Sequence, residues 1–132
     1  MASAHFHVKG HDLASASHIE LPSFDTGEYE ASELHMSEGK AVLRVHIAGR
    51  EPVQIAFACV RWHRFTSLYA CPAEWISGYY FKVGVVGNSR ELAEHLEADQ
   101  ASVKPYKQLH HFRIFLDKTG CHEFLAESAD AL

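Results

Sequence analysis

The stretch LHHFRIFLDKTGCHEFLAES, residues 109–128, decides the fold of this chain. Apolar and polar residues alternate on both sides of a short polar segment, and this pattern is typical of a β-hairpin. A three-residue loop, 118–120, puts the large apolar residues on one face, with Gly120 supplying the left-handed backbone of the third loop position. A four-residue loop would instead bury Glu123, which is costly. The predicted cross-strand pairs are Asp117 with Cys121, Leu116 with His122, Ile114 with Phe124, and Phe112 with Ala126.

The histidines of this hairpin are expected to lie apart. His110 and His122 share the inner face but stand at opposite ends, on the order of 20 Å apart at about 3.3 Å per residue. One metal ion needs ligand atoms about 2 Å away, so the two do not share an ion within the hairpin. His111 falls on the outward face opposite Glu127, where a polar cross-strand pair accounts for it.

Two-fold alternation predicts further strands upstream. The segment VLRVHIAG (42–49) places Val45 and Ile47 on one face, and PVQIAFACVRWHRFT (52–66) follows after a turn. A strand over EYEASELHM (28–36) precedes them through the turn SEGK, and YYFKVGVVG (79–87) returns to β character. In the 52–66 segment, Val53, Ile55, Phe57 and Cys59 are expected along one side.

Two segments are predicted to be helical. A short helical turn near 72–77 would have Pro72 at its first position and Gly78 as its stop. The principal helix near 88–98 would be capped by Asn88, with Glu91 completing a capping box. The sequence therefore predicts an α+β fold, mainly an antiparallel β-sheet of meander or sandwich type.

Composition limits the classes of protein to consider. A chain of 132 residues is the size of one domain, so 1–132 is expected to be a single domain with about ten flexible N-terminal residues. Three widely spaced cysteines without a CxxC pair favour a reducing, cytoplasmic setting. No apolar run suits a membrane span, and the start does not resemble a signal peptide. A net charge of −5 argues against nucleic acid as a partner.

The charge is distributed unevenly along the chain. Residues 1–38 hold one base, Lys9, against seven acids, whereas residues 40–64 hold five bases against Glu51 alone. One interpretation is that two solvated strand faces partly neutralise each other. The other is an acidic surface that binds a basic partner, because complementary fields favour association. Its candidate contact residues are Glu28, Glu30 and Glu33.

A second candidate contact surface is the stretch VRWHRF, residues 60–65. Arginines interleaved with aromatic residues can form a protein-binding strip, and the candidates are Arg61, Trp62 and Arg64. One strand would place Trp62 and Arg64 on the same face, opposite His63 and Phe65. The alternative is that Trp62 is half-buried and covered by its neighbours.

Candidate metal ligands are few. His5 and His7 have a spacing that aligns two imidazoles on one strand face, and His11 follows nearby. None of the common phosphate-, nucleotide- or metal-binding motifs occurs, and no cofactor is expected. An enzyme that binds a metal or small ligand with histidines from separate strands is one alternative function. A self-associating protein, forming a homodimer through exposed strand edges, is another.

The region from Val53 to Ser128 resembles small bacterial proteins, some of which look like immunity proteins of toxin systems. The resemblance lies in the strand ending VRWHRFT, the aromatic strand that follows, the segment GNSRELAEHL and the closing hairpin. It implies a non-enzymatic, cytoplasmic protein that recognises another protein, with no catalytic residue to transfer. An acidic N-terminal segment agrees with a basic toxin as that partner, and protein recognition is the leading hypothesis.

Overall fold

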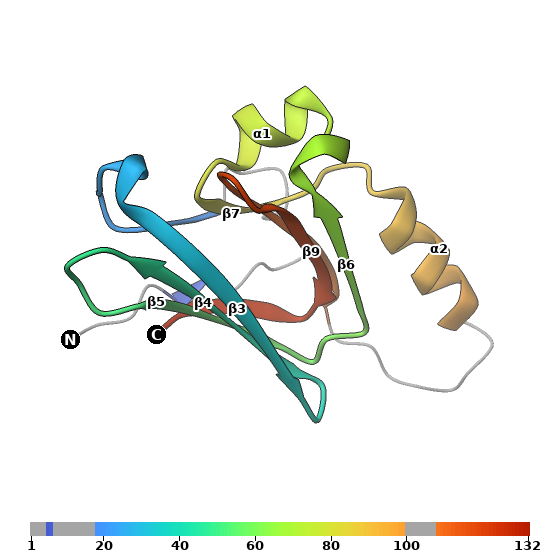
Figure 1. Ribbon diagram of the computed structural model, residues 1–132. Coiled ribbons are helices and arrows are strands. Elements are labelled where there is room, and N and C mark those ends of the chain that lie inside the picture. The colour runs from blue at the N-terminus through green and yellow to red at the C-terminus, as the bar shows by residue number, and fades with distance from the viewer. Residues whose placement is uncertain (1–4, 7–17, 100–107) are drawn as a thin grey trace.

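The computed structural model describes residues 5–6, 18–99 and 108–132, which form two five-stranded sheets (Figure 1). In sheet A the strand order is β1 (His5–Phe6), β10 (Ser128–Ala131), β5 (Val53–Ala58), β4 (Lys40–Ile47) and β3 (Tyr29–Ser37). In sheet B the order is β2 (His18–Glu20), β7 (Lys82–Val85), β8 (His110–Leu116), β9 (Gly120–Ala126) and β6 (Trp62–Ser67). Neighbouring strands of both sheets are antiparallel, so the predicted α+β, mainly antiparallel class is confirmed.

The helices of the described chain are short. They are the 3-10 helices η2 (Thr26–Glu28) and η3 (Leu68–Ala70) and the α-helices α1 (Ala73–Tyr79) and α2 (Arg90–Asp99). Figure 1 shows both α-helices beside sheet B, away from the β3–β4–β5 meander.

The predicted helix boundaries need three corrections. Pro72 is the residue before α1 rather than its first residue, and Gly78 lies within the helix rather than stopping it. The capping residue of α2 is Ser89, whose Oγ accepts the N–H of Leu92 at 3.0 Å, and not Asn88. Asn88 has a left-handed φ of 51°, which turns the chain into the helix.

The closing hairpin forms with a different register. Leu116 pairs with Gly120, Ile114 with His122 and Phe112 with Phe124, so the loop is 117–119 and each predicted pair is displaced by two residues. A displacement of two residues keeps every side chain on its predicted face. The left-handed loop residue is Lys118, with φ of 64°. Gly120 is needed for another reason: at φ 138°, a Cβ there would lie 2.3 Å from the carbonyl oxygen of Thr66 on β6.

The meander of sheet A follows the predicted alternation. The β3–β4 turn uses Glu38 and Gly39, both with positive φ, as a two-residue hairpin requires. Val45 and Ile47 are buried, whereas Arg44 is exposed on the opposite face. Cys59, predicted to continue the buried side of β5, instead leaves the strand with φ of 54° and is exposed.

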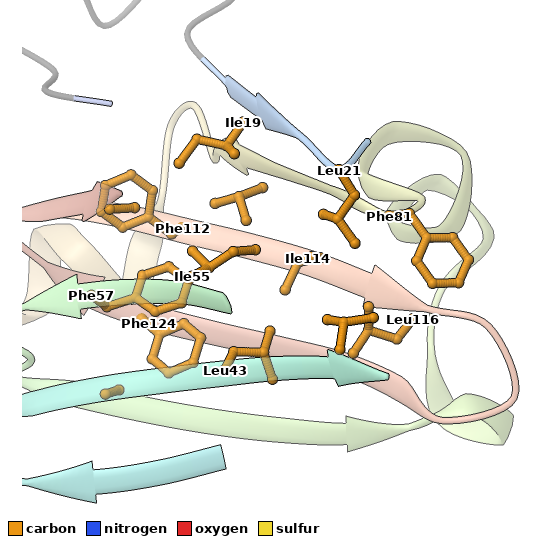
Figure 2. Close-up of a cluster of buried hydrophobic side chains, with 14 of the residues drawn as sticks. Ile19, Leu21, Leu43, Ile55, Phe57, Phe81, Phe112, Ile114, Leu116 and Phe124 are labelled. Carbon is orange, nitrogen blue, oxygen red and sulfur yellow. The ribbon is translucent and has the colours of Figure 1, made fainter. Parts of the chain in front are cut away.

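The space between the two sheets is filled by apolar side chains (Figure 2). Phe57 of sheet A stacks on Phe124 of sheet B with centroids 4.0 Å apart, and lies 5.9 Å from the ring of Phe112. Leu43, Ile55 and Ile114 are fully buried around them. Each such side chain contributes about 1.5–3 kcal/mol on burial, so this layer is the main stabilising element of the fold.

Candidate functional site

The outer face of sheet B carries a buried layer of charged residues. His111 and Arg113 on β8 and Glu123 on β9 point away from the apolar core, as strand alternation requires. They are nevertheless 0%, 8% and 0% exposed. Since α1 and α2 lie over this face, side chains that would otherwise meet water are enclosed.

Glu123 is the centre of this layer. Its Oε1 accepts hydrogen bonds from His111 Nε2 at 2.8 Å and from Arg113 Nη2 at 2.9 Å. Its Oε2 accepts from Arg64 Nε at 2.9 Å, and Arg64 also reaches Glu91 of α2 at 3.3 Å. Burial by itself would raise the pKa of Glu123, but the bonds from His111, Arg64 and Arg113 outweigh it and lower the pKa to about 2. The carboxylate is therefore ionised and fully paired.

A chain of hydrogen bonds links this carboxylate to the start of α2. Because ionised Glu123 can only accept, Nε2 of His111 donates to it, and Nδ1 of His111 lies 2.6 Å from the Ser89 hydroxyl oxygen. The order Ser, His, Glu resembles a nucleophilic relay. However, the imidazole is fully buried, and Ser89 Oγ already accepts the N–H of Leu92. The arrangement caps the helix and orients the His111 imidazole. We call Glu123, Arg64, Arg113, His111, Ser89 and Glu91 the Glu123 cluster.

Cation–π contacts between arginines and aromatic rings hold α1 against this layer. The guanidinium carbon of Arg113 lies 4.0 Å from the ring centroid of Trp75 and 5.1 Å from that of Tyr79. That of Arg64 lies 5.1 Å from the Trp62 centroid and 5.6 Å from the Trp75 centroid. The result is an alternating ladder, in the order Trp62, Arg64, Trp75, Arg113 and Tyr79. Cation–π contacts contribute about 0.5–1 kcal/mol at exposed sites and about 2 kcal/mol when desolvated, so the ladder stabilises the packing of α1 on sheet B.

The structure corrects the predicted surroundings of His111. It lies on the outer face of sheet B, as predicted, but its cross-strand partner is Leu125 rather than Glu127, and it is fully buried because α2 covers this part of the face. The ion pair between Arg113 and Glu123 could not be seen in the predicted register. In the observed register the two residues are direct cross-strand partners. Trp75, Tyr79 and Ser89 complete the site. Trp75 and Ser89 come from segments predicted only as helical, whereas Tyr79 lies in the segment 79–87 that was predicted as a strand and is in fact the last residue of α1.

Two residues of the predicted VRWHRF strip belong to this internal layer. Trp62 and Arg64 share a face, as predicted, and both are half-buried. The backbone N–H of Arg61 donates to the carbonyl of Leu125 at 2.7 Å. The contacts of Arg64 with Glu123 and of Trp62 with Arg64 therefore join the strip to the fold.

The acidic candidates lie elsewhere, at the edge of sheet A. Glu28 ends η2, and Glu30 and Glu33 are on β3 with exposed side chains. Glu33 is bound by His46 Nε2 at 2.8 Å and lies 3.7 Å from Arg44, and the hydrogen bond from His46 lowers its pKa. Glu28 and Glu30 make no ion pair with any residue in the described ranges. The carboxylate of Glu33 is thus neutralised by its neighbours, whereas no described residue neutralises those of Glu28 and Glu30.

A pair of histidines lies at the margin of the core, where β6 pairs with β9. His63 Nε2 lies 3.1 Å from His122 Nδ1, and the ring of Phe65 lies 4.8 Å from that of His122. Burial, and then the neighbouring His63, lower the pKa of His122 to about 4. Burial also lowers the pKa of His63. Both rings are therefore held neutral at pH 7.

The predicted metal ligands lie largely outside the described residues. His7, His11 and the side chain of His5 are not among the described residues. Within the described residues, no group of three or more His, Cys, Asp or Glu side chains has the arrangement of a metal site.

The described chain is a two-sheet sandwich in which α1 and α2 cover part of one outer face. None of its helices has the length and apolar character to cross a membrane. The chain matches no family model, no curated protein and no solved structure.

Proposed function

We propose that this chain is a non-enzymatic binding protein that recognises a basic segment of another protein along β3. The observation that carries the proposal is the position of this strand. β3 runs for nine residues at the edge of sheet A, and among the described strands only β4 pairs with it. Its second edge offers a row of backbone donors and acceptors to a partner strand.

An exposed edge is a common docking site because a partner's extended segment adds to the sheet as another strand. Backbone hydrogen bonds then supply affinity, and alternate side chains supply specificity. Met36, 46% exposed near the end of β3, offers an apolar contact. The register irregularity between Tyr29 and Ala31 confines regular pairing to the part of the strand beyond it.

The free carboxylates at the start of β3 select the charge of the partner. Glu28 and Glu30 are exposed and unneutralised by the described residues, and Asp25 lies just before them. Lysine and arginine on a partner segment would find both a strand edge and a negative potential. This combination favours a basic protein partner over a second copy of the chain, because two copies would bring like charges together.

A bacterial immunity protein that neutralises a basic toxin in the cytoplasm fits this surface, and we propose that role. The acidic residues Glu28 and Glu30 beside this edge, which form no ion pair with a described residue, support it. Blocking a toxin needs a complementary surface and no chemistry of its own.

The test is capture of the partner at low ionic strength, followed by hydrogen exchange of the complex. The proposal expects backbone amides of β3 to gain protection, together with an affinity that falls as salt rises. The Glu28→Gln, Glu30→Gln double variant should weaken the complex at least about tenfold. The matched control is Glu94→Gln with Glu97→Gln, which removes the same charge from exposed positions on α2 and should leave affinity unchanged.

Two results would contradict the proposal. One is a complex in which protection appears on other strands while β3 continues to exchange freely. The other is equal weakening by the β3 and α2 variants, which would mean that only the net charge matters. A mass in solution that doubles with concentration, without any partner, would point to the homodimer instead.

A further inference from the structure

A cleft lies between α1 and the strands β2 and β7. It has a volume of about 480 Å³, and its lining includes Trp75, Tyr79, Lys82, Gly84 and Arg113. This is within the usual size range of small-molecule sites, roughly 300–1,000 Å³. Protein recognition at β3 does not use it. We call it the α1 cleft.

The floor of the α1 cleft presents a fixed cation. Arg113 donates Nε and Nη2 to Glu123 Oε1 at 3.1 and 2.9 Å. Its remaining nitrogen, Nη1, has no hydrogen-bond partner in the described part of the chain and is not among the polar atoms sealed from solvent. Since the guanidinium is also stacked on Trp75 at 4.0 Å, it cannot turn away. A ligand would meet two N–H donors that are already oriented.

Lys82 adds a second cation to the wall. It is half-buried, lines the cleft and forms no ion pair with a described residue. Its cross-strand partner Glu20 is instead hydrogen-bonded by His18 at 3.2 Å. Among the described residues of the lining, Glu74 is the one acid, and it is exposed. The cleft therefore has more cationic donors than carboxylates to neutralise them.

The apolar part of the wall is equally well defined. Tyr79 packs against the backbone of Gly84, where an added Cβ would lie 2.9 Å from the ring carbon Cε1. Because Gly84 has no side chain, the Tyr79 ring packs directly against the backbone of β7. The rings of Trp75 and Tyr79 thus bound the cavity beside its two cations.

We propose that the α1 cleft binds a small organic oxyanion. Its carboxylate or phosphate would be held by Arg113 Nη1 and Lys82, and its apolar body would lie against the aromatic wall. Charge-assisted hydrogen bonds to fixed donors contribute more than neutral ones, so the anionic group determines which ligands bind.

The test is an NMR titration of the full chain with benzoate and, separately, with phenyl phosphate, at constant ionic strength. Benzyl alcohol is the uncharged control. Saturable shifts at the Trp75 indole N–H and the Gly84 amide are expected, with a Kd in the millimolar range or tighter. Whichever of the two anions binds more tightly assigns the carboxylate or phosphate class.

Lys82→Gln should weaken binding about tenfold or more, because one charged hydrogen bond is lost. Lys40→Gln makes the same change at an exposed position of β4 and should not affect binding. Arg113 is left unchanged, since its loss would unpair Glu123. The inference is overturned if neither anion gives saturable shifts, if benzyl alcohol binds equally well, if the shifts map outside the cleft, or if Lys82→Gln binds as the wild type does.

Discussion

Each sheet carries on its outer face a glutamate that pairs with basic residues, but this glutamate is exposed on sheet A and buried on sheet B. On sheet A, Glu33 pairs with His46 and Arg44 across β3 and β4, and its side chain is 58% exposed. On sheet B, Glu123 pairs with Arg64 and Arg113 across β6, β8 and β9, and its side chain is 0% exposed. The difference is that α1 and α2 cover one face, whereas the described helices leave the other to solvent.

This contrast separates structural charges from charges available for recognition. An exposed pair adds little to stability, because water screens it and long side chains lose entropy in forming it. A buried pair is different, since removing one partner leaves an uncompensated charge in a dry layer. Sheet A can therefore exchange its charge contacts for a partner's, while sheet B cannot. This is why we place recognition on β3 and not on the VRWHRF strip.

The largest expected effect follows from breaking the Glu123 cluster. Glu123→Gln leaves Arg64 and Arg113 without their shared carboxylate and should lower the free energy of unfolding by about 3–5 kcal/mol. Glu33→Gln is the matched control on sheet A and should leave the unfolding free energy nearly unchanged. Urea titrations of both variants measure the difference. Equal losses would remove the distinction between the two faces.

The next largest effect is expected from acidification, which should lower the free energy of unfolding through the histidine pair His63 and His122. The folded pKa of His122 is about 4, below its ordinary 6.5, so the unfolded chain binds a proton that the folded chain excludes. Stability therefore falls as pH drops below about 6.5, by about 2 kcal/mol at pH 5, and His63 acts in the same direction. Glu123 does not contribute in this window, because its carboxylate protonates in the unfolded chain only near pH 4.5.

Unfolding free energies measured from pH 7 to pH 5 test this effect. His122→Gln cannot bind the proton, so its stability should depend less on pH than that of the wild type. An unchanged slope in that variant would mean that His122 is accessible to protons in the folded protein.

A smaller effect is expected where α1 meets sheet B. In Gly84→Ala the new methyl group would lie 2.9 Å from Tyr79 Cε1, so the ring must move off β7 and away from Arg113. Such overpacking costs about 1–3 kcal/mol, and because a ring can shift we expect the lower end. Gly78→Ala is the control, because it adds the same methyl group on α1 where no atom lies within 4 Å. Thermal unfolding that shows Gly78→Ala to be the more damaging change would contradict this packing.

The smallest effect concerns the start of α2. Ser89→Ala removes the cap on the Leu92 N–H and the partner of His111 Nδ1, at a cost of about 1 kcal/mol. Ser89→Thr keeps the hydroxyl and should retain most of the stability. Hydrogen exchange in the first turn of α2 reports the change directly. Equal exchange in the alanine variant would show that the hydroxyl is not the cap.

The sequence predicted the inner half of this molecule better than the outer half. Alternation identified the strands of the closing hairpin and placed Phe112, Ile114 and Phe124 on the core face, and the structure confirms all three. The register was wrong by two residues because both registers bury the same residues, so hydrophobicity could not distinguish them. The close approach of the Thr66 carbonyl to Gly120 favours the true register, and it is a tertiary contact.

The Glu123 cluster could not be predicted from hydrophobic alternation, for a related reason. A charged residue opposite an apolar face is expected to meet water, and only the position of a covering helix changes that expectation. Loop lengths in a sequence do not say on which side of a sheet a helix of seven or ten residues will pack. The cross-strand pair of Arg113 with Glu123 was the one available signal, and the displaced register concealed it.

The central claim is that an ionised carboxylate, buried beneath α1 and α2, makes the ion pairs of sheet B structural and leaves protein recognition to the open edge at β3. The most direct test is a pH titration of the Glu123 side-chain carboxyl carbon by NMR. We predict a midpoint near pH 2, because His111, Arg64 and Arg113 all stabilise the charged form. A midpoint in the ordinary range of glutamate, about 4.3, or above it would show that these contacts are absent in solution and would contradict the account.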